Sequence, residues 1–164
     1  FGHPVPVVAG QLQPPSKSEY TKGIGTDVVS RVLQTDFSDE EDHVLMDLSG
    51  AYRVPSLESL TRNFTHCRTG DGVVTVIDAV RFSSPERFET ALITYGEWSQ
   101  RPDGVLRLHD GDSGIDVRVR CEEGSLEFDH LVIQESSTPT RLSWRLVETV
   151  TAASIRIEVR PAHD

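Results

Sequence analysis

Apolar and polar residues alternate along most of this chain, and this two-residue period constrains its fold more than any other feature. Ile155, Ile157 and Val159 alternate with charged residues, and the same pattern runs through residues 115–121 and 126–130. Successive side chains of a β-strand point to opposite faces, so the period predicts strands with one buried and one solvated face. Val, Ile and Thr are frequent in these runs, as is typical of strands.

Short segments rich in Gly, Asp and Pro separate the alternating runs, for example residues 69–72, 101–104 and 122–124. Glycine supplies the positive φ angles that tight turns require. With these segments as boundaries, we expect about eleven strands at the spacing of a sandwich. They lie near residues 5–8, 26–35, 43–48, 57–66, 73–80, 88–94, 104–109, 115–121, 125–131, 141–148 and 153–160. The sequence predicts an all-β, antiparallel, multi-stranded β-sandwich with little or no helix.

The composition fits one globular domain over residues 1–164. A chain of 164 residues buries roughly 70% of the surface that its unfolded form exposes, and 37% of these residues are hydrophobic. The 16 Lys and Arg against 26 Asp and Glu give a formal net charge of −10, which argues against a nucleic-acid partner. The sequence has no apolar run of about 18 residues, so we expect no membrane span.

Several catalytic signatures are absent from the sequence. It has no Gly-rich phosphate loop, no nucleophile elbow and no Cys or His pair at zinc spacing, and its six histidines are scattered. The two cysteines, Cys67 and Cys121, are too few for a disulfide scaffold, and the sequence leaves open whether they pair.

Aromatic residues are candidates for binding a sugar, since a flat ring covers the apolar face of a pyranose. Tyr95 and Trp98 follow a predicted strand, and Tyr52 lies in a loop. We predict that these three residues bind substrate, although an isolated surface aromatic is also common in proteins without a ligand. Trp144 lies in an apolar run and is predicted to be part of the core.

Four arginines are predicted to point outward from strands: Arg118, Arg120, Arg156 and Arg160. They could line a groove for an anionic glycan, because guanidinium groups bind carboxylate and sulfate in bidentate fashion. The alternative is cross-strand pairing with acidic neighbours on the same face. The sequence favours pairing without excluding the groove.

The chain begins with Phe1-Gly2-His3-Pro4, which is neither an initiator methionine nor a signal peptide. A predicted strand follows at once. We therefore expect the chain to be a fragment whose upstream sequence is missing, and the residues present do not identify its compartment.

Three segments in order resemble one family. Residues 2–11 (GHPVPVVAGQ) resemble a His-Asn/Ser-x-Pro-x-x-Asn-Gly strand, and residues 47–52 (DLSGAY) resemble an Asp-x-x-Gly-Ala-Tyr segment that precedes a strand with a central arginine, here Arg62. Residues 71–78 (DGVVTVID) resemble a hairpin that leads into a Val-rich strand ending in Asp. The family is that of the heparinase II/III-like polysaccharide lyases, and the resemblance covers residues 2–95.

The resemblance implies the carboxy-terminal β-sandwich domain of a bacterial, periplasmic or secreted enzyme that degrades glycosaminoglycans or alginate. Family members join an α-helical toroid to this sandwich and cleave uronate-containing acidic polysaccharides by β-elimination. The implied partners are the acidic polysaccharide and the upstream helical domain of the same chain. Because that domain carries most of the catalytic groups, we assign no catalytic residue here and expect little or no turnover in isolation.

The resemblance also implies a metal ligand. Many family members have a zinc site of two His and one Asp, and His3 resembles one of these histidines. The other two ligands would lie upstream of Phe1, so we expect zinc in the full-length parent and no metal held by this fragment alone. Two further readings remain open: a non-catalytic carbohydrate-binding module, and an assembly module whose sheet edges pair in a homodimer.

Overall fold

The computed structural model describes residues 3–14, 29–134 and 138–162. Twelve strands and one short 3-10 helix, η1 (Ser49–Ala51), lie within these residues. The strands are β1 (Val7–Val8), β2 (Arg31–Phe37), β3 (Glu41–Asp47), β4 (Leu57–Cys67), β5 (Val74–Glu86), β6 (Phe88–Thr94), β7 (Glu97–Gln100), β8 (Leu106–Asp110), β9 (Ser113–Cys121), β10 (Leu126–Val132), β11 (Thr140–Leu146) and β12 (Val150–Pro161). The predicted all-β class with antiparallel pairing is confirmed.

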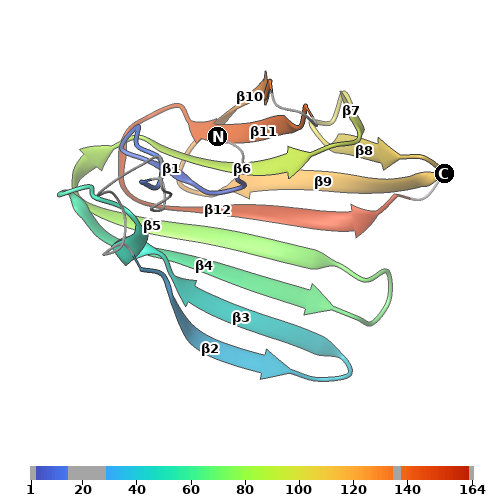
Figure 1. Cartoon of the computed structure of the whole chain (residues 1–164), viewed down its shortest axis with the longest axis horizontal. Helices are drawn as coiled ribbons and strands as arrows, with labels where there is room; N and C mark the ends of the chain where they lie inside the picture. Colours follow the sequence, from blue (N-terminus) through green and yellow to red (C-terminus); the bar gives the residue numbers. More distant parts are fainter. Residues whose placement is uncertain (1–2, 15–28, 135–137, 163–164) are drawn as a thin grey trace, which may run out of the picture.

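The strands form two sheets (Figure 1). The small sheet has four strands in the order β1-β6-β11-β10, and the large sheet has eight in the order β2-β3-β4-β5-β12-β9-β8-β7. Alternate side chains of both sheets meet in two buried clusters. One contains Leu60, Val80, Phe88 and Ile155, among others. The other surrounds Trp144, which is 6% exposed, so its predicted place in the core is confirmed.

The strand predicted over residues 26–35 is described only in part: residues 26–28 lie outside the described residues, and β2 runs from Arg31 to Phe37. Three other departures from the predicted strands are larger. β7 was not expected, because four residues with only one half-buried side chain carry little periodic signal. β5 continues to Glu86, well beyond the predicted end at residue 80. Residues 122–124 join β9 of the large sheet to β10 of the small sheet, and period two does not reveal that two consecutive runs belong to different sheets.

The large sheet is wider than the small one. Every residue of its edge strand β2 is exposed, including Val32 at 59% and Phe37 at 65%. In Figure 1, β2 and β3 lie at the bottom of the view, away from β6 and β11. An exposed edge strand can pair with another chain, and the homodimer remains a prediction.

Two further expectations concern membrane-spanning segments and the pairing of the two cysteines. Within residues 3–14, 29–134 and 138–162, no helix is long and apolar enough to cross a membrane. Cys67 and Cys121 are both free thiols.

Candidate functional site

The amino-terminal segment, residues 3–8, carries the motif with the predicted metal ligand. Its last two residues form β1, which pairs with β6 through Val7 and Glu89 and through Val8 and Phe88. The next two residues, Ala9 and Gly10, have φ angles of 50° and 75°. The chain then turns back, and Val8 and Gln11 exchange two backbone hydrogen bonds of 2.9 and 2.8 Å. Such tight turns favour Asn-Gly, because asparagine tolerates a positive φ better than alanine does.

Buried side chains hold the four carbonyl groups that precede β1. Arg141 donates from Nη1 to the His3 oxygen at 3.0 Å and from Nη2 to the Val5 oxygen at 3.1 Å. Arg62 Nη1 donates to the Pro4 oxygen at 2.7 Å. The Tyr52 hydroxyl donates to the Pro6 oxygen at 2.7 Å. Residues 3–6 are therefore fixed by side chains from β4, β11 and the loop after η1, instead of by a strand ladder.

Acidic partners compensate both buried arginines. Asp78 of β5, which is 1% exposed, accepts from Arg62 Nε at 2.6 Å and from Arg62 Nη2 at 2.7 Å. Thr90 of β6 also donates to Asp78. Arg141 pairs with Glu89 at 3.0 Å. We call these five residues the interior polar layer; its members are Arg62, Asp78, Glu89, Thr90 and Arg141.

The environment of the interior polar layer shifts two pKa values. Burial works to lower the pKa of Arg62, but the hydrogen bond and the charge of Asp78 outweigh it, so the pKa is raised. Burial raises the pKa of Tyr52, and the nearby Arg62 opposes this shift only in part. Both groups therefore keep the protonated form that donates to the backbone carbonyls.

His3, the predicted metal ligand, is exposed, and its backbone oxygen is the one that accepts from Arg141. Within the described part of the chain, no group of three His, Cys, Asp or Glu side chains is placed to hold a metal ion. One imidazole does not make a zinc site, which needs three or four ligands. The described residues therefore do not fit zinc by themselves, and zinc in the parent remains a prediction.

The structure does not bring the predicted aromatic residues together on one surface. Tyr52 is 6% exposed with its hydroxyl bound to Pro6, so its ring offers no face to a sugar. Trp98 is half-buried against the core, with its ring 5.6 Å from that of Phe128 and 4.8 Å from that of His130.

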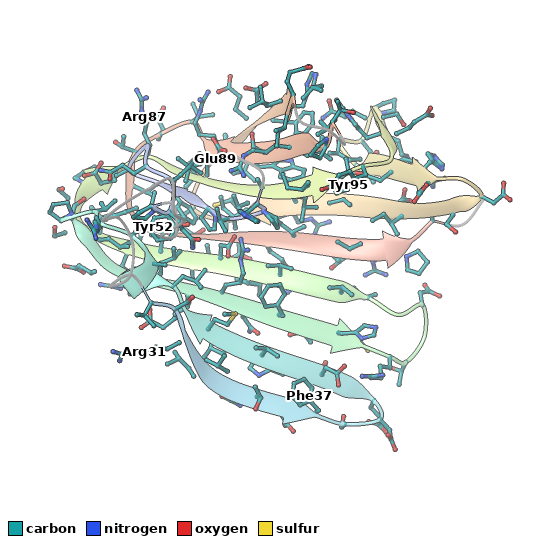
Figure 2. All side chains as sticks on the ribbon, viewed as in Figure 1. Arg31, Phe37, Tyr52, Arg87, Glu89 and Tyr95 are labelled. Atoms are coloured by element: carbon teal, nitrogen blue, oxygen red, sulfur yellow. The ribbon has the colours of Figure 1, made fainter. Side chains whose placement is uncertain are left out.

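Of the three aromatics predicted to bind substrate, only Tyr95 has an exposed ring. It is 72% exposed in the turn between β6 and β7, and Figure 2 shows it well apart from Tyr52. It lines a shallow hollow of about 360 Å³ together with Thr94, His109 and Ser113. Tyr95 is therefore the one predicted aromatic whose position suits a ligand.

A second polar region lies on the outer face of the large sheet. Six arginines line two adjoining hollows there, and we call this region the outer arginine face. Its members are Arg101, Arg107, Arg118, Arg120, Arg156 and Arg160. The register places Arg118 opposite Glu158 and Arg160 opposite Asp116, as the predicted cross-strand pairing requires. The closest contacts are different, because Asp116 binds Arg107 of β8 at 2.5 Å and Glu158 binds Arg160 of its own strand at 2.8 Å.

Sequence reasoning did not assign a role to Arg141, Glu89 or Thr90. Arg141 is out of phase with the inward-facing Leu142 and Trp144, so periodicity alone places it on a solvated face. Arg62 and Asp78 were part of the family motifs, and both share the inward phase of apolar neighbours on their own strands. In each of two strands, one charged residue takes a position where the alternation predicts a buried apolar side chain: Arg62 in β4 and Asp78 in β5. This signal could have located the interior polar layer from the sequence.

Comparison with known proteins supports the fold. No protein-family model and no curated protein sequence matches the chain. The structure is similar to heparan sulfate lyase HepC from Pedobacter heparinus, with a TM-score of 0.62 and 10% identity over 99% of this chain. It is also similar to heparinase III, with a TM-score of 0.59 and 12% identity over 81% of this chain. The chain spans 24% and 21% of these two proteins, so it matches one part of each.

Proposed function

We propose that this chain is the carboxy-terminal β-sandwich domain of a heparinase II/III-like polysaccharide lyase. The observation that carries the proposal is the match of nearly the whole chain, 99%, to about a quarter of a heparan sulfate lyase. The order of the three sequence motifs in residues 2–95 supports the same assignment. The enzyme would act by β-elimination on uronate-containing acidic glycans, either glycosaminoglycans or alginate, in the periplasm or outside a bacterial cell.

β-Elimination defines which groups such an enzyme needs. The proton on C5 of a uronate is weakly acidic, so the adjacent carboxylate must be neutralised while negative charge develops. A base removes the proton, and an acid protonates the leaving oxygen. We place these groups in an upstream α-helical domain, which would be the main partner of this chain. The isolated chain is then inactive or nearly so.

The contribution of this chain would be a fixed wall of the substrate cleft. The carbonyls of residues 3–6 are held by Arg62, Arg141 and Tyr52, so the backbone that carries the exposed His3 has a defined position. Groups that face a substrate work best when packing and hydrogen bonds fix their position. His3 is the residue of this chain that we place nearest the chemistry, and no reaction step is assigned to a metal.

The natural polypeptide that includes the residues before Phe1 tests this proposal. We expect it to form unsaturated uronate products, detected by ultraviolet absorbance, from at least one of heparan sulfate, hyaluronan and alginate. The 164-residue chain alone should form none. In the longer polypeptide, His3→Ala should lower kcat by about a hundredfold, the size of effect expected when a group that positions the substrate is lost.

The matched control is His43→Ala, because His43 lies on β3, outside both the amino-terminal segment and the hollow beside Tyr95, and its loss should leave kcat unchanged. A longer polypeptide without a helical domain, or without activity on any acidic glycan, would contradict the proposal. Turnover by the 164-residue chain alone would contradict the assignment of the acid and base groups to the upstream helical domain.

Binding without chemistry is the second candidate, and the exposed ring of Tyr95 beside its hollow favours it. Under that reading, the 164-residue chain is retarded by a neutral glycan in affinity electrophoresis. Tyr95→Ala should abolish the retardation, whereas Tyr52→Phe should not.

A further inference from the structure

The centre of the outer arginine face breaks a rule of strand pairing. Arg120 of β9 and Arg156 of β12 stand directly opposite each other, on strands that lie side by side in Figure 1. Like charges at directly opposite positions destabilise a sheet. Arg118 is two residues before Arg120 on the same face, so three guanidinium groups gather over two strands. Local features that reduce stability without a structural gain are expected at functional sites.

These three arginines have weak partners or none. The Arg118 and Asp103 side chains approach no closer than 3.7 Å. Arg156 lies 3.6 Å from Glu158 and donates to Thr75 Oγ1 at 3.3 Å. Arg120 is exposed and forms no hydrogen bond or ion pair within the described part of the chain. Their donor groups are therefore available to a ligand.

The arginines that surround the three central ones have close acidic partners. Two of them form short hydrogen bonds with carboxylates of this face. Arg107 binds Asp116 through two hydrogen bonds of 2.5 and 3.0 Å. Arg160 donates to Glu158 at 2.8 Å. Hydrogen bonds from Arg107 and Arg160 hold the pKa values of Asp116 and Glu158, respectively, below their ordinary values. Both carboxylates stay ionised, and Arg107 and Arg160 are their closest partners. Glu158 also stands opposite Arg118 and lies 3.6 Å from Arg156, so it compensates these two arginines in part, and Arg120 keeps the least compensation.

The shape of the surface suits an extended ligand. Arg120 lies between two hollows, one of about 600 Å³ that also includes Arg156 and Ser154, and one of about 550 Å³ that includes Arg118. The two hollows together are lined by six arginines and six acidic residues, so the excess of positive charge is confined to the three central arginines and is not spread over the whole face. A ligand must therefore carry anionic groups close to Arg120.

The lining of the hollows favours a polysaccharide over a nucleic acid. Among the residues that the structure describes, no Phe, Tyr or Trp ring lines either hollow, whereas single-stranded nucleic acids bind by stacking on such rings. Sulfate and carboxylate groups on a sugar chain match the fork of the guanidinium group.

We propose that Arg118, Arg120 and Arg156 form a second glycan-binding site, on the outer face of the large sheet, that binds sulfate or carboxylate groups of an acidic polysaccharide. The site is built from β9 and β12 and includes no residue of the amino-terminal segment. The choice of an acidic polysaccharide as the ligand rests on the proposed function. The positions of the three arginines do not depend on that proposal. It would hold a part of the polymer away from the residues that carry the chemistry.

Isothermal titration calorimetry of the 164-residue chain tests this site, with heparin as the sulfated probe and hyaluronan as the probe with carboxylates alone. Binding of heparin alone assigns the site to sulfate, and binding of both assigns it to either anion. Arg120→Gln should raise the Kd about tenfold, and the triple Arg118→Gln, Arg120→Gln, Arg156→Gln variant should raise it about a hundredfold. Circular dichroism verifies that each variant keeps its strands.

The matched control is Arg87→Gln, an exposed arginine at the turn between β5 and β6 that is labelled in Figure 2. It removes the same charge and should leave the Kd within twofold. The proposal is overturned if Arg87→Gln weakens binding as much as Arg120→Gln, if neither polysaccharide binds, or if single-stranded DNA binds more tightly than heparin. These results do not depend on turnover, so this site and the lyase assignment can fail separately.

Discussion

Arginine occurs in two contrasting environments in this molecule. In the interior polar layer, Arg62 and Arg141 are 8% and 2% exposed, and each binds a carboxylate and backbone carbonyls. On the outer arginine face, Arg118 and Arg156 are about half exposed, and their ion pairs with Asp103 and Glu158 are longer, at 3.7 and 3.6 Å. The same side chain therefore supports the fold in one region and remains available for binding in the other.

The physical reason is the difference in solvation. A buried guanidinium loses its water, so it must find charged or polar partners or the fold is destabilised by several kcal/mol. An exposed guanidinium keeps its water, and a surface ion pair contributes only about 0–1 kcal/mol. An arginine without a close partner is thus tolerated only outside, where a ligand can reach it.

The largest effect is expected from Arg62→Met. The substitution leaves Asp78, which is 1% exposed, without its cationic partner. We expect the free energy of unfolding to fall by about 3–5 kcal/mol, measured by urea denaturation. The double variant Arg62→Met, Asp78→Leu is the control and should recover much of this loss, since it removes both charges. If the single variant lost less than about 1 kcal/mol of unfolding free energy, the buried Arg62 would contribute no more than an exposed arginine of the outer face. That result would contradict the difference drawn between the two regions.

A smaller effect is expected from Tyr52→Phe, which leaves the Pro6 carbonyl without its donor. The free energy of unfolding should fall by about 1 kcal/mol at neutral pH. Because burial raises the pKa of Tyr52, its phenol stabilises the fold fully below the unfolded value near pH 10, and this stabilisation is lost as the pH rises toward the folded value. Urea denaturation between about pH 8 and 11 should show a steeper decline for the natural chain than for Tyr52→Phe.

Tyr95→Phe serves as the control for that experiment, because Tyr95 is 72% exposed and its hydroxyl faces water. It should reproduce the pH profile of the natural chain. If Tyr95→Phe also flattened the profile, the decline would not come from the buried phenol.

The smallest effect on stability is expected from Arg120→Gln. The free energy of unfolding should change by less than about 0.5 kcal/mol, as for most exposed substitutions. At low salt the variant should be slightly more stable than the natural chain, because the repulsion from Arg156 is removed. Urea denaturation at low salt and at about 1 M salt measures this difference. A large loss of stability would show that Arg120 has a structural role, as Arg62 has.

Much of the fold followed from local patterns. Two-residue alternation located most strands, and the glycine-containing segments at residues 69–72 and 101–104 connect paired neighbours, β4 with β5 and β7 with β8. Strand β7 was missed because Glu97–Gln100 is too short to show a period. The motif that contains His3 was visible in the sequence, but the position of His3 depends on side chains more than forty residues away.

The candidate site was less predictable than the fold. Tyr52 was expected to bind substrate, yet it is buried with its hydroxyl bound to Pro6. Arg120 was expected to point outward, and it does, but its place opposite Arg156 depends on the register between β9 and β12. Pairing partners are not encoded in the period of either strand.

The sequence by itself determined that this chain forms strands and which side chains share a face, because side-chain direction alternates in any β-strand. Only the tertiary structure decided which faces are covered. Arg141 illustrates the point: its phase is that of a solvated residue, but the amino-terminal segment, 136 or more residues away in sequence, brings carbonyls to it and it is 2% exposed. Burial of a face depends on contacts between distant segments, and a local pattern does not contain them.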